Sequence, residues 1–120
     1  MKNKIEITKE ELISKNYRKF KKFFKDLEKD RLEFADKLCK KAAFMDVMLE
    51  DMQSKITEEG AVITAVNGNG FKVQMDNPAI KAYNIMFKNY STAMKQLIDL
   101  LPQGAEEEDD LLMFVKGKKR

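Results

Sequence analysis

The chain has 120 residues, enough for one domain of ordinary size, with 43% apolar residues, 36% charged residues and a net charge of +3. It contains no His, no Trp and a single Cys, so a His-dependent catalytic triad, a His-liganded zinc and a Cys-cluster metal site cannot be built from it. We therefore expect a protein that is not an enzyme and that uses no cofactor and no metal.

The first predicted helix is basic and amphipathic and runs from Thr8 to about Glu28. Thr8 with Glu11 three residues later forms a capping box, and Lys15 with Asn16 marks a place where the helix could divide. Residues 1–41 hold 14 basic and 8 acidic side chains, so the positive charge of the chain collects here. The apolar face consists of Leu12, Ile13, Phe20, Phe23, Phe24 and Leu27.

Five cations on this helix predict a contact with DNA. They fall within roughly 120° of arc at 100° per residue, opposite the aromatic side chains, and no acidic residue interrupts residues 12–25. Cations near phosphates give affinity with a steep salt dependence and little sequence readout. A solvated face and an anionic membrane surface are the alternatives, and composition does not separate DNA from RNA. The candidate DNA-binding residues, here called the basic stripe, are Lys15, Arg18, Lys19, Lys22 and Lys25.

A longer amphipathic helix is predicted from Asp30 to about Glu59. Asp30 with Glu33 resembles a second capping box, and Gly60 would end the helix in a left-handed conformation. At about 40 Å it is too long for one small three-helix globule to cover evenly. Its apolar face consists of Leu32, Ala35, Cys39, Ala42, Met45, Leu49, Met52 and Ile56.

A β-hairpin is predicted after this helix. Residues 61–66 are rich in β-branched side chains, residues 67–70 read Asn-Gly-Asn-Gly, and residues 71–75 alternate apolar and polar side chains. A lone hairpin is marginal in water, so it should lie against helices or a neighbouring subunit. The turn lacks the spacing of nucleotide phosphate-binding loops, so no nucleotide hydrolysis is expected.

The last long helix opens with Asn77 as its cap and Pro78 in its first position. It carries a seven-residue apolar repeat and a second apolar ridge, which favours contacts with other copies of the chain, a purely internal core being the alternative. Its lysines at 81, 88 and 95 could line a positive channel or simply be solvated. The candidate oligomer interface, here called the heptad ladder, is Ile80, Tyr83, Phe87, Tyr90, Met94, Leu97 and Leu101.

Residues 103–120 are predicted to form a flexible tail with an acidic linker, an apolar cluster and a basic end. Such a segment suits docking into a groove on a partner, with ordering only on binding. Packing back on its own domain, or adding a strand to a sheet edge, remain open. The candidate partner-docking residues are Leu111, Leu112, Met113, Phe114 and Val115.

The predicted chain is mainly α, with long antiparallel helices and one small β-hairpin. We divide the chain into three segments: an N-terminal basic helix over residues 1–29, an oligomerisation core over residues 30–102 and the tail over residues 103–120. No apolar run reaches the roughly 18–20 residues of a membrane span, and no signal peptide is expected. Cys39 is expected to be a buried helix residue in a reducing cytoplasm.

The order of these features resembles the small terminase subunits of tailed double-stranded-DNA bacteriophages. The likeness covers about residues 28–102: a long helix ending in Glu-Glu-Gly at 58–60, an extended Ala-Val-Ile-Thr, an Asn-Gly-rich turn, Asn-Pro-Ala at 77–79 opening the next helix, and Leu-Leu-Pro at 100–102. Many members carry an N-terminal helix-turn-helix, which is not found here, so the basic stripe predicts phosphate contact only.

This resemblance implies a non-catalytic protein of the host cytoplasm that assembles into a homo-oligomeric ring. It implies binding of viral double-stranded DNA at the start of genome packaging, and regulation of a large terminase subunit that carries the ATPase and nuclease, engaged through residues 111–115. The main alternative is a coiled-coil interaction or scaffold module without nucleic-acid binding. A small transcriptional regulator is a further alternative, although no recognition helix is visible.

Overall fold

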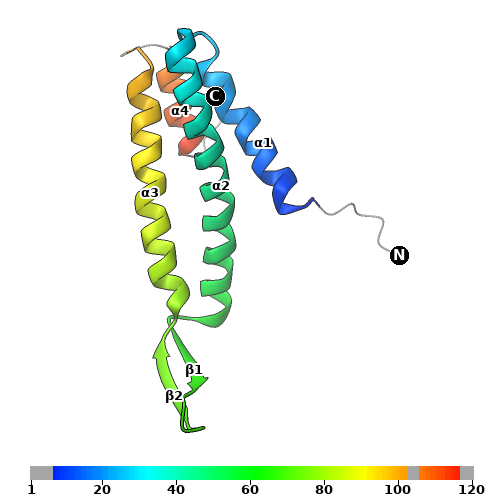
Figure 1. Cartoon of the computed structure of the whole chain (residues 1–120), viewed down its shortest axis with the longest axis vertical. Coiled ribbons are helices and arrows are strands. Elements are labelled where there is room, and N and C mark those ends of the chain that lie inside the picture. The colour runs from blue at the N-terminus through cyan, green and yellow to red at the C-terminus, as the bar shows by residue number, and fades with distance from the viewer. Residues whose placement is uncertain (1–6, 103–105, 117–120) are drawn as a thin grey trace, which may run out of the picture.

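The structure, a computed structural model, describes residues 7–102 and 106–116 and measures 59 × 41 × 25 Å. Its long helices α2 and α3 pack side by side in antiparallel directions, and a two-stranded antiparallel hairpin joins them (Figure 1). The prediction of a mainly helical chain with one hairpin is therefore confirmed. The elements are α1 (Lys9–Lys21), the 3-10 turn η1 (Lys22–Phe24), α2 (Lys29–Glu59), β1 (Val62–Val66), β2 (Lys72–Asp76), α3 (Pro78–Leu100) and α4 (Glu106–Val115).

The first helix begins where the sequence predicts but ends earlier. The Thr8 hydroxyl accepts from the Glu11 amide at 3.1 Å and the Glu11 carboxylate accepts from the Thr8 amide at 3.3 Å, which confirms the capping box. The helix continues unbroken past Lys15 and ends at Lys21 instead of Glu28. A 3-10 turn follows, and it brings Phe20 and Phe24, each 1% exposed, into the core.

The start of α2 also corrects a prediction. The helix begins at Lys29, with Glu28 as its N-cap and no side-chain cap hydrogen bond, so the expected capping box at Asp30 is wrong. Asp30 instead lies in the first helical turn, where a carboxylate is favourable because the amide dipoles leave that end positive.

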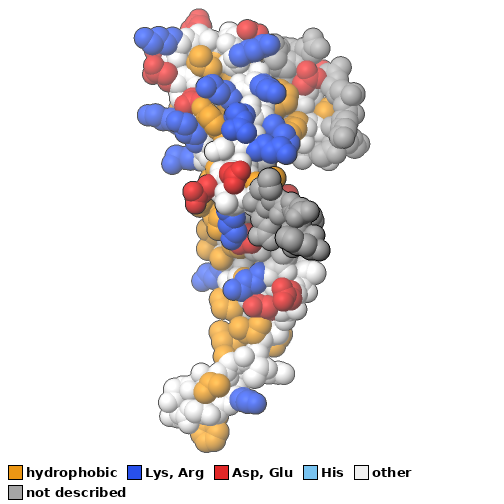
Figure 2. Space-filling model, turned by 90° about the vertical axis from the view of Figure 1, so that its right-hand side faces the viewer, with side chains coloured by type: hydrophobic (Ala, Val, Ile, Leu, Met, Phe, Trp, Pro, Cys, Tyr) orange, Lys and Arg blue, Asp and Glu red, His pale blue; other side chains and the backbone are white. Residues whose placement is uncertain are grey.

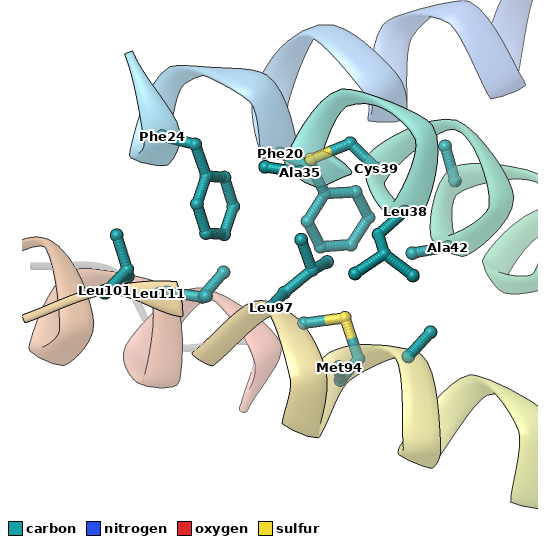
Figure 3. Close-up of a cluster of buried hydrophobic side chains, with 12 residues drawn as sticks. Phe20, Phe24, Ala35, Leu38, Cys39, Ala42, Met94, Leu97, Leu101 and Leu111 are labelled. Atoms are coloured by element: carbon teal, nitrogen blue, oxygen red, sulfur yellow. The ribbon is translucent and has the colours of Figure 1, made fainter. Parts of the chain in front are cut away.

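The core lies at one end of the α2–α3 pair, here called the closed end, where α1, η1 and α4 cover both long helices. On α2 it is made of small residues, with Ala35, Cys39 and Ala42 each 0% exposed. Small side chains let the rings of Phe20 and Phe24 approach the helix closely, and Figure 3 shows these rings pointing toward α3 and α4. The rest of the core is Leu38, Ala43, Ala93, Met94, Leu97, Leu101 and Leu111.

The opposite end, here called the open end, consists of the hairpin and the adjoining halves of α2 and α3. Val62, Val66 and Phe71 on the hairpin are 52%, 66% and 68% exposed, and Phe87 on α3 is 51% exposed. Among the described residues, η1 and α4 stay at the closed end, and α1 reaches along α2 as far as the Lys9–Asp51 ion pair (Figure 1). The long helices are thus covered unevenly, as their length predicts.

The hairpin turn is closed by Asn67. Its side-chain oxygen accepts from the amides of Asn69 at 2.9 Å and Phe71 at 3.0 Å, and its own amide donates to the Phe71 carbonyl at 2.8 Å. Gly70 has a φ of +82°, a conformation that L side chains rarely adopt. The Asn-Gly-rich sequence therefore forms the predicted turn.

One buried side chain joins α2, the hairpin and α3. Asn77 is 3% exposed; its oxygen accepts from the Ala79 amide at 3.0 Å, and its side-chain amide donates to the Gly60 carbonyl at 2.9 Å and to Glu59 Oε1 at 3.2 Å. Gly60 ends α2 with φ +88° and ψ 175°. Its positive φ is as predicted, but its ψ is extended instead of left-handed helical, a combination nearly restricted to glycine.

Replacing Asn77 should destabilise the fold because it caps α3 and satisfies the Gly60 carbonyl. We expect Asn77→Ala to lower the free energy of unfolding by about 2–3 kcal/mol. Asn77→Asp keeps the cap but loses the hydrogen bonds donated to Gly60 and Glu59, and it places a carboxylate next to that of Glu59. Its loss of stability should therefore be smaller at acidic pH, where these carboxylates are protonated. Urea unfolding followed by circular dichroism measures both, with Asn84→Ala, at an exposed site, as control; equal losses in Asn77→Ala and the control would contradict the assignment.

Candidate nucleic-acid interface

All five residues of the basic stripe are exposed on the arm formed by α1, η1 and the residue that follows. The backbone keeps right-handed helical angles at Lys21, Lys22 and Lys25, so the chain goes on turning in the same sense past the end of α1. Figure 2 looks onto the α1 side of the molecule, and Lys and Arg side chains gather over its closed end. The stripe predicted from helical periodicity therefore forms a surface.

Other cations of α1 have protein partners. Lys9 forms an ion pair with Asp51 at 2.7 Å, and Lys21 lies 5.6 Å from the centre of the Tyr17 ring. Within residues 7–102 and 106–116, no ion pair between a stripe cation and a carboxylate is found at 4.0 Å or less. The stripe cations thus form no direct ion pair with a carboxylate there, which leaves them available to phosphate groups.

Polar side chains attach the arm to α2. The Tyr17 hydroxyl donates to the Asp36 carboxylate, and Lys40 lies 3.4 Å from the same carboxyl group. The hydrogen bond from Tyr17, and then the charge of Lys40, hold the pKa of Asp36 below its usual value. The pKa of Tyr17 is raised, first by this hydrogen bond and then by desolvation.

A second polar contact lies nearer the middle of α2, at Asp46, whose charged form is less stable than that of Asp36. The Asn16 side-chain amide donates to Asp46 at 3.1 Å, and burial, followed by the charge of Glu50, raises the pKa of Asp46. Burial, with the charges of Asp46 and Glu50 adding to it, raises the pKa of Tyr90 to about 12. Negative charge is therefore costly in this part of the interface between the arm and the long helices.

The heptad ladder divides between the two ends of the molecule. Met94, Leu97 and Leu101 are 5%, 0% and 6% exposed inside the core of the single chain, so in this structure they are not accessible to another copy. Ile80, Tyr83 and Tyr90 are half-buried. Phe87 is half exposed, and its ring stacks on that of Tyr83 at 6.2 Å between centroids.

Residues 106–115 of the tail form the helix α4, which packs on the closed end, as in the alternative of packing back on its own domain. Leu111 is 0% exposed, and the Phe114 ring lies 5.4 Å from that of Phe20 and 5.7 Å from that of Phe23. Leu112 and Val115 remain 36% and 41% exposed, and Met113 is half-buried. Residues 103–105 of the acidic linker and residues 117–120 of the basic end lie outside the described residues.

The sequence carried a signal for α4 that our prediction did not use. Five acidic residues at 106–110 precede the apolar cluster, and acidic side chains are favoured in the first turns of a helix. Leu111 and Phe114 are three residues apart and therefore share one helical face, which is the face turned toward the core.

The described residues include no metal-binding cluster, and Cys39 is buried. In the described ranges, no three His, Cys, Asp or Glu side chains are arranged to hold a metal ion. Cys39 is 0% exposed, and its burial raises the pKa of its thiol to about 12, so the reactive thiolate is scarce.

Comparison with known proteins returned no relative. No protein-family model, no curated protein and no solved structure matches the chain. Across the part of the chain that the structure describes, none of the helices combines the length and the apolar character needed to cross a bilayer.

We expect Asp46→Asn to stabilise the protein at neutral pH. Because the pKa of Asp46 is raised in the folded state, the folded chain binds this proton more tightly than the unfolded chain does. The free energy of unfolding therefore falls as pH rises from the ordinary carboxyl pKa of 3.8 toward the raised value. The asparagine oxygen can still accept from Asn16. Thermal melts should show a higher Tm for the variant at pH 7 and no difference below about pH 3.5.

The matched control for this prediction is Asp99→Asn, at an exposed position on α3. If the two variants raise Tm equally at pH 7, burial of Asp46 is not the cause.

Proposed function

We propose that this chain is a non-catalytic small terminase subunit of a tailed bacteriophage. In this role it binds viral double-stranded DNA through the basic stripe, assembles with copies of itself into a ring, and recruits and regulates a large terminase subunit during genome packaging. The proposal rests on the sequence resemblance over residues 28–102 and, above all, on the five exposed cations that share one side of the arm.

The form of the arm supports phosphate contact without reading of base sequence. Side chains at 15, 18, 19, 22 and 25 repeat along one helical face, so they can follow a phosphate backbone. The opposite face of the arm, with Phe20 and Phe24, is buried in the core and fixes which side of the arm faces outward. Affinity would then come chiefly from counterion release.

The double variant Lys19→Glu with Lys22→Glu tests the DNA contact. It should weaken binding to every DNA sequence and reduce the slope of log affinity against log salt by about 2, because roughly one counterion is released per phosphate contact. Filter binding or fluorescence anisotropy at several salt concentrations measures this slope.

Lys55→Glu with Lys72→Glu is the matched control, because it makes the same change in net charge at two exposed positions of the open end. Equal weakening by both variants would show that only net charge matters and would remove the stripe from the proposal. Weak binding with a flat salt response in the wild-type chain would favour a scaffold module without nucleic-acid binding.

For the large subunit, the exposed side of α4 is the proposed contact. Leu112→Ala with Val115→Ala should leave the free energy of unfolding within about 0.5 kcal/mol of the wild type and should reduce stimulation of the partner's ATPase. Leu111→Ala should instead cost about 2–4 kcal/mol, because its side chain is fully buried. Unchanged stimulation by the double variant would show that α4 is a structural element only.

A further inference from the structure

The hairpin has one face without charge. The register pairs Ile63 with Met75 and Ala65 with Val73. Because side chains alternate between the two faces of a strand, these four residues lie on one face, and Phe71 continues it. We call these five residues the apolar hairpin face. The opposite face carries Val62, Thr64, Val66, Lys72, Gln74 and Asp76.

The described part of the chain covers this face only in part: Ile63 and Ala65 on β1 are half-buried, whereas its other three residues are exposed. Phe71, Met75 and Val73 are 68%, 43% and 38% exposed, and the hairpin extends beyond the ends of α2 and α3 (Figure 1). A two-stranded hairpin needs a third strand or a packed face to be stable in water. The missing cover should therefore come from another molecule.

The adjoining helices share this exposure. On α3, Ile85 is 54% exposed and Phe87 is 51% exposed, although both are large apolar side chains. In Figure 2, hydrophobic side chains continue along one edge of the lower half of the molecule as far as the hairpin. Exposed apolar surface of this extent, next to polar residues, marks a protein contact.

The distribution of charge favours a second copy over nucleic acid as the partner, and self-association is already part of the proposed function. Each chain carries a net charge of +3, and the basic stripe lies at the closed end. Copies that meet at the open end keep their stripes apart and so repel one another least. The apolar hairpin face has no cation for a phosphate and no charge that an identical copy would oppose, so it disfavours nucleic acid and favours a like surface.

We propose that the apolar hairpin face is the surface through which copies of this chain bind one another. The contact joins copies at their open ends and directs the basic stripes outward. The inference rests on the self-association contained in the proposed function, but not on DNA binding. It places the contact on the hairpin instead of on the ladder residues Met94, Leu97 and Leu101, which the single chain buries.

Sedimentation velocity over a dilution series tests this placement. Phe71→Thr with Val73→Thr changes the apolar hairpin face, whereas Val62→Thr with Val66→Thr makes a matched change on the opposite face. Threonine keeps strand propensity in both. The first variant should raise the dissociation constant of the assembly at least tenfold and the second should leave it unchanged, with equal helical circular dichroism.

The outcomes separate this inference from the proposed function. If the wild-type chain is a monomer at every concentration, the ring is overturned together with the hairpin contact. If the wild type associates and the two variants associate as it does, only the hairpin contact is overturned.

Thiol labelling gives a second measurement that does not depend on a weakened fold. Ala65→Cys places a thiol on the apolar hairpin face and Thr64→Cys places one on the opposite face, while the native Cys39 is buried and has a raised pKa that keeps it unreactive. Maleimide should react with the Ala65→Cys thiol at least tenfold more slowly in concentrated than in dilute protein, and with the Thr64→Cys thiol at the same rate in both. No dependence on concentration at position 65 overturns the proposal, including where the face instead binds a different protein.

Discussion

The fold depends on the uneven burial of the two long helices, α2 and α3, by the rest of the chain. With 31 residues, α2 is about 45 Å long. Among the described segments that cover the α2–α3 pair, η1 and α4 pack at one end, and α1 extends from there along α2 as far as Asp51. At the closed end, Phe20, Phe24 and Leu111 fill the space above the small residues of α2. At the other end, within residues 7–102 and 106–116, the two helices pack on each other and are joined by the hairpin. A pair of helices buries one side of each partner, so the remaining apolar side chains stay in water unless another molecule covers them.

This unevenness divides the surface by chemistry. The basic stripe and the exposed side of α4 lie at the closed end, whereas the apolar hairpin face lies at the open end. In the proposed function, contacts with DNA and with the large subunit would therefore not compete for the surface that joins the copies. Asn77 supports this arrangement, because its hydrogen bonds fix the hairpin to the ends of both long helices.

Local signals predicted the parts of the fold that neighbouring residues determine. Thr8, Gly60 and Asn77 set helix ends through hydrogen bonds or backbone angles within a few residues, so the predicted ends are confirmed there. The 3-10 turn after Lys21 was not predicted, and packing of the tail on its own domain was one of several alternatives left open, because contacts between residues 20–24 and 111–114 join segments far apart in sequence. The exposure of the basic stripe followed from helical periodicity. Periodicity did not predict which residues of the heptad ladder are buried within the single chain, because it identifies an apolar face but not the segment that packs against it.

The arm formed by α1 is anchored differently at its two ends. Near η1 it is fixed by aromatic rings in the core, whereas toward its beginning its contacts with α2 include the exposed Lys9–Asp51 pair and the Asn16–Asp46 hydrogen bond. Salt weakens an exposed ion pair but not a buried ring. Raising the salt concentration should therefore loosen the beginning of the arm before it loosens the end that carries Phe20.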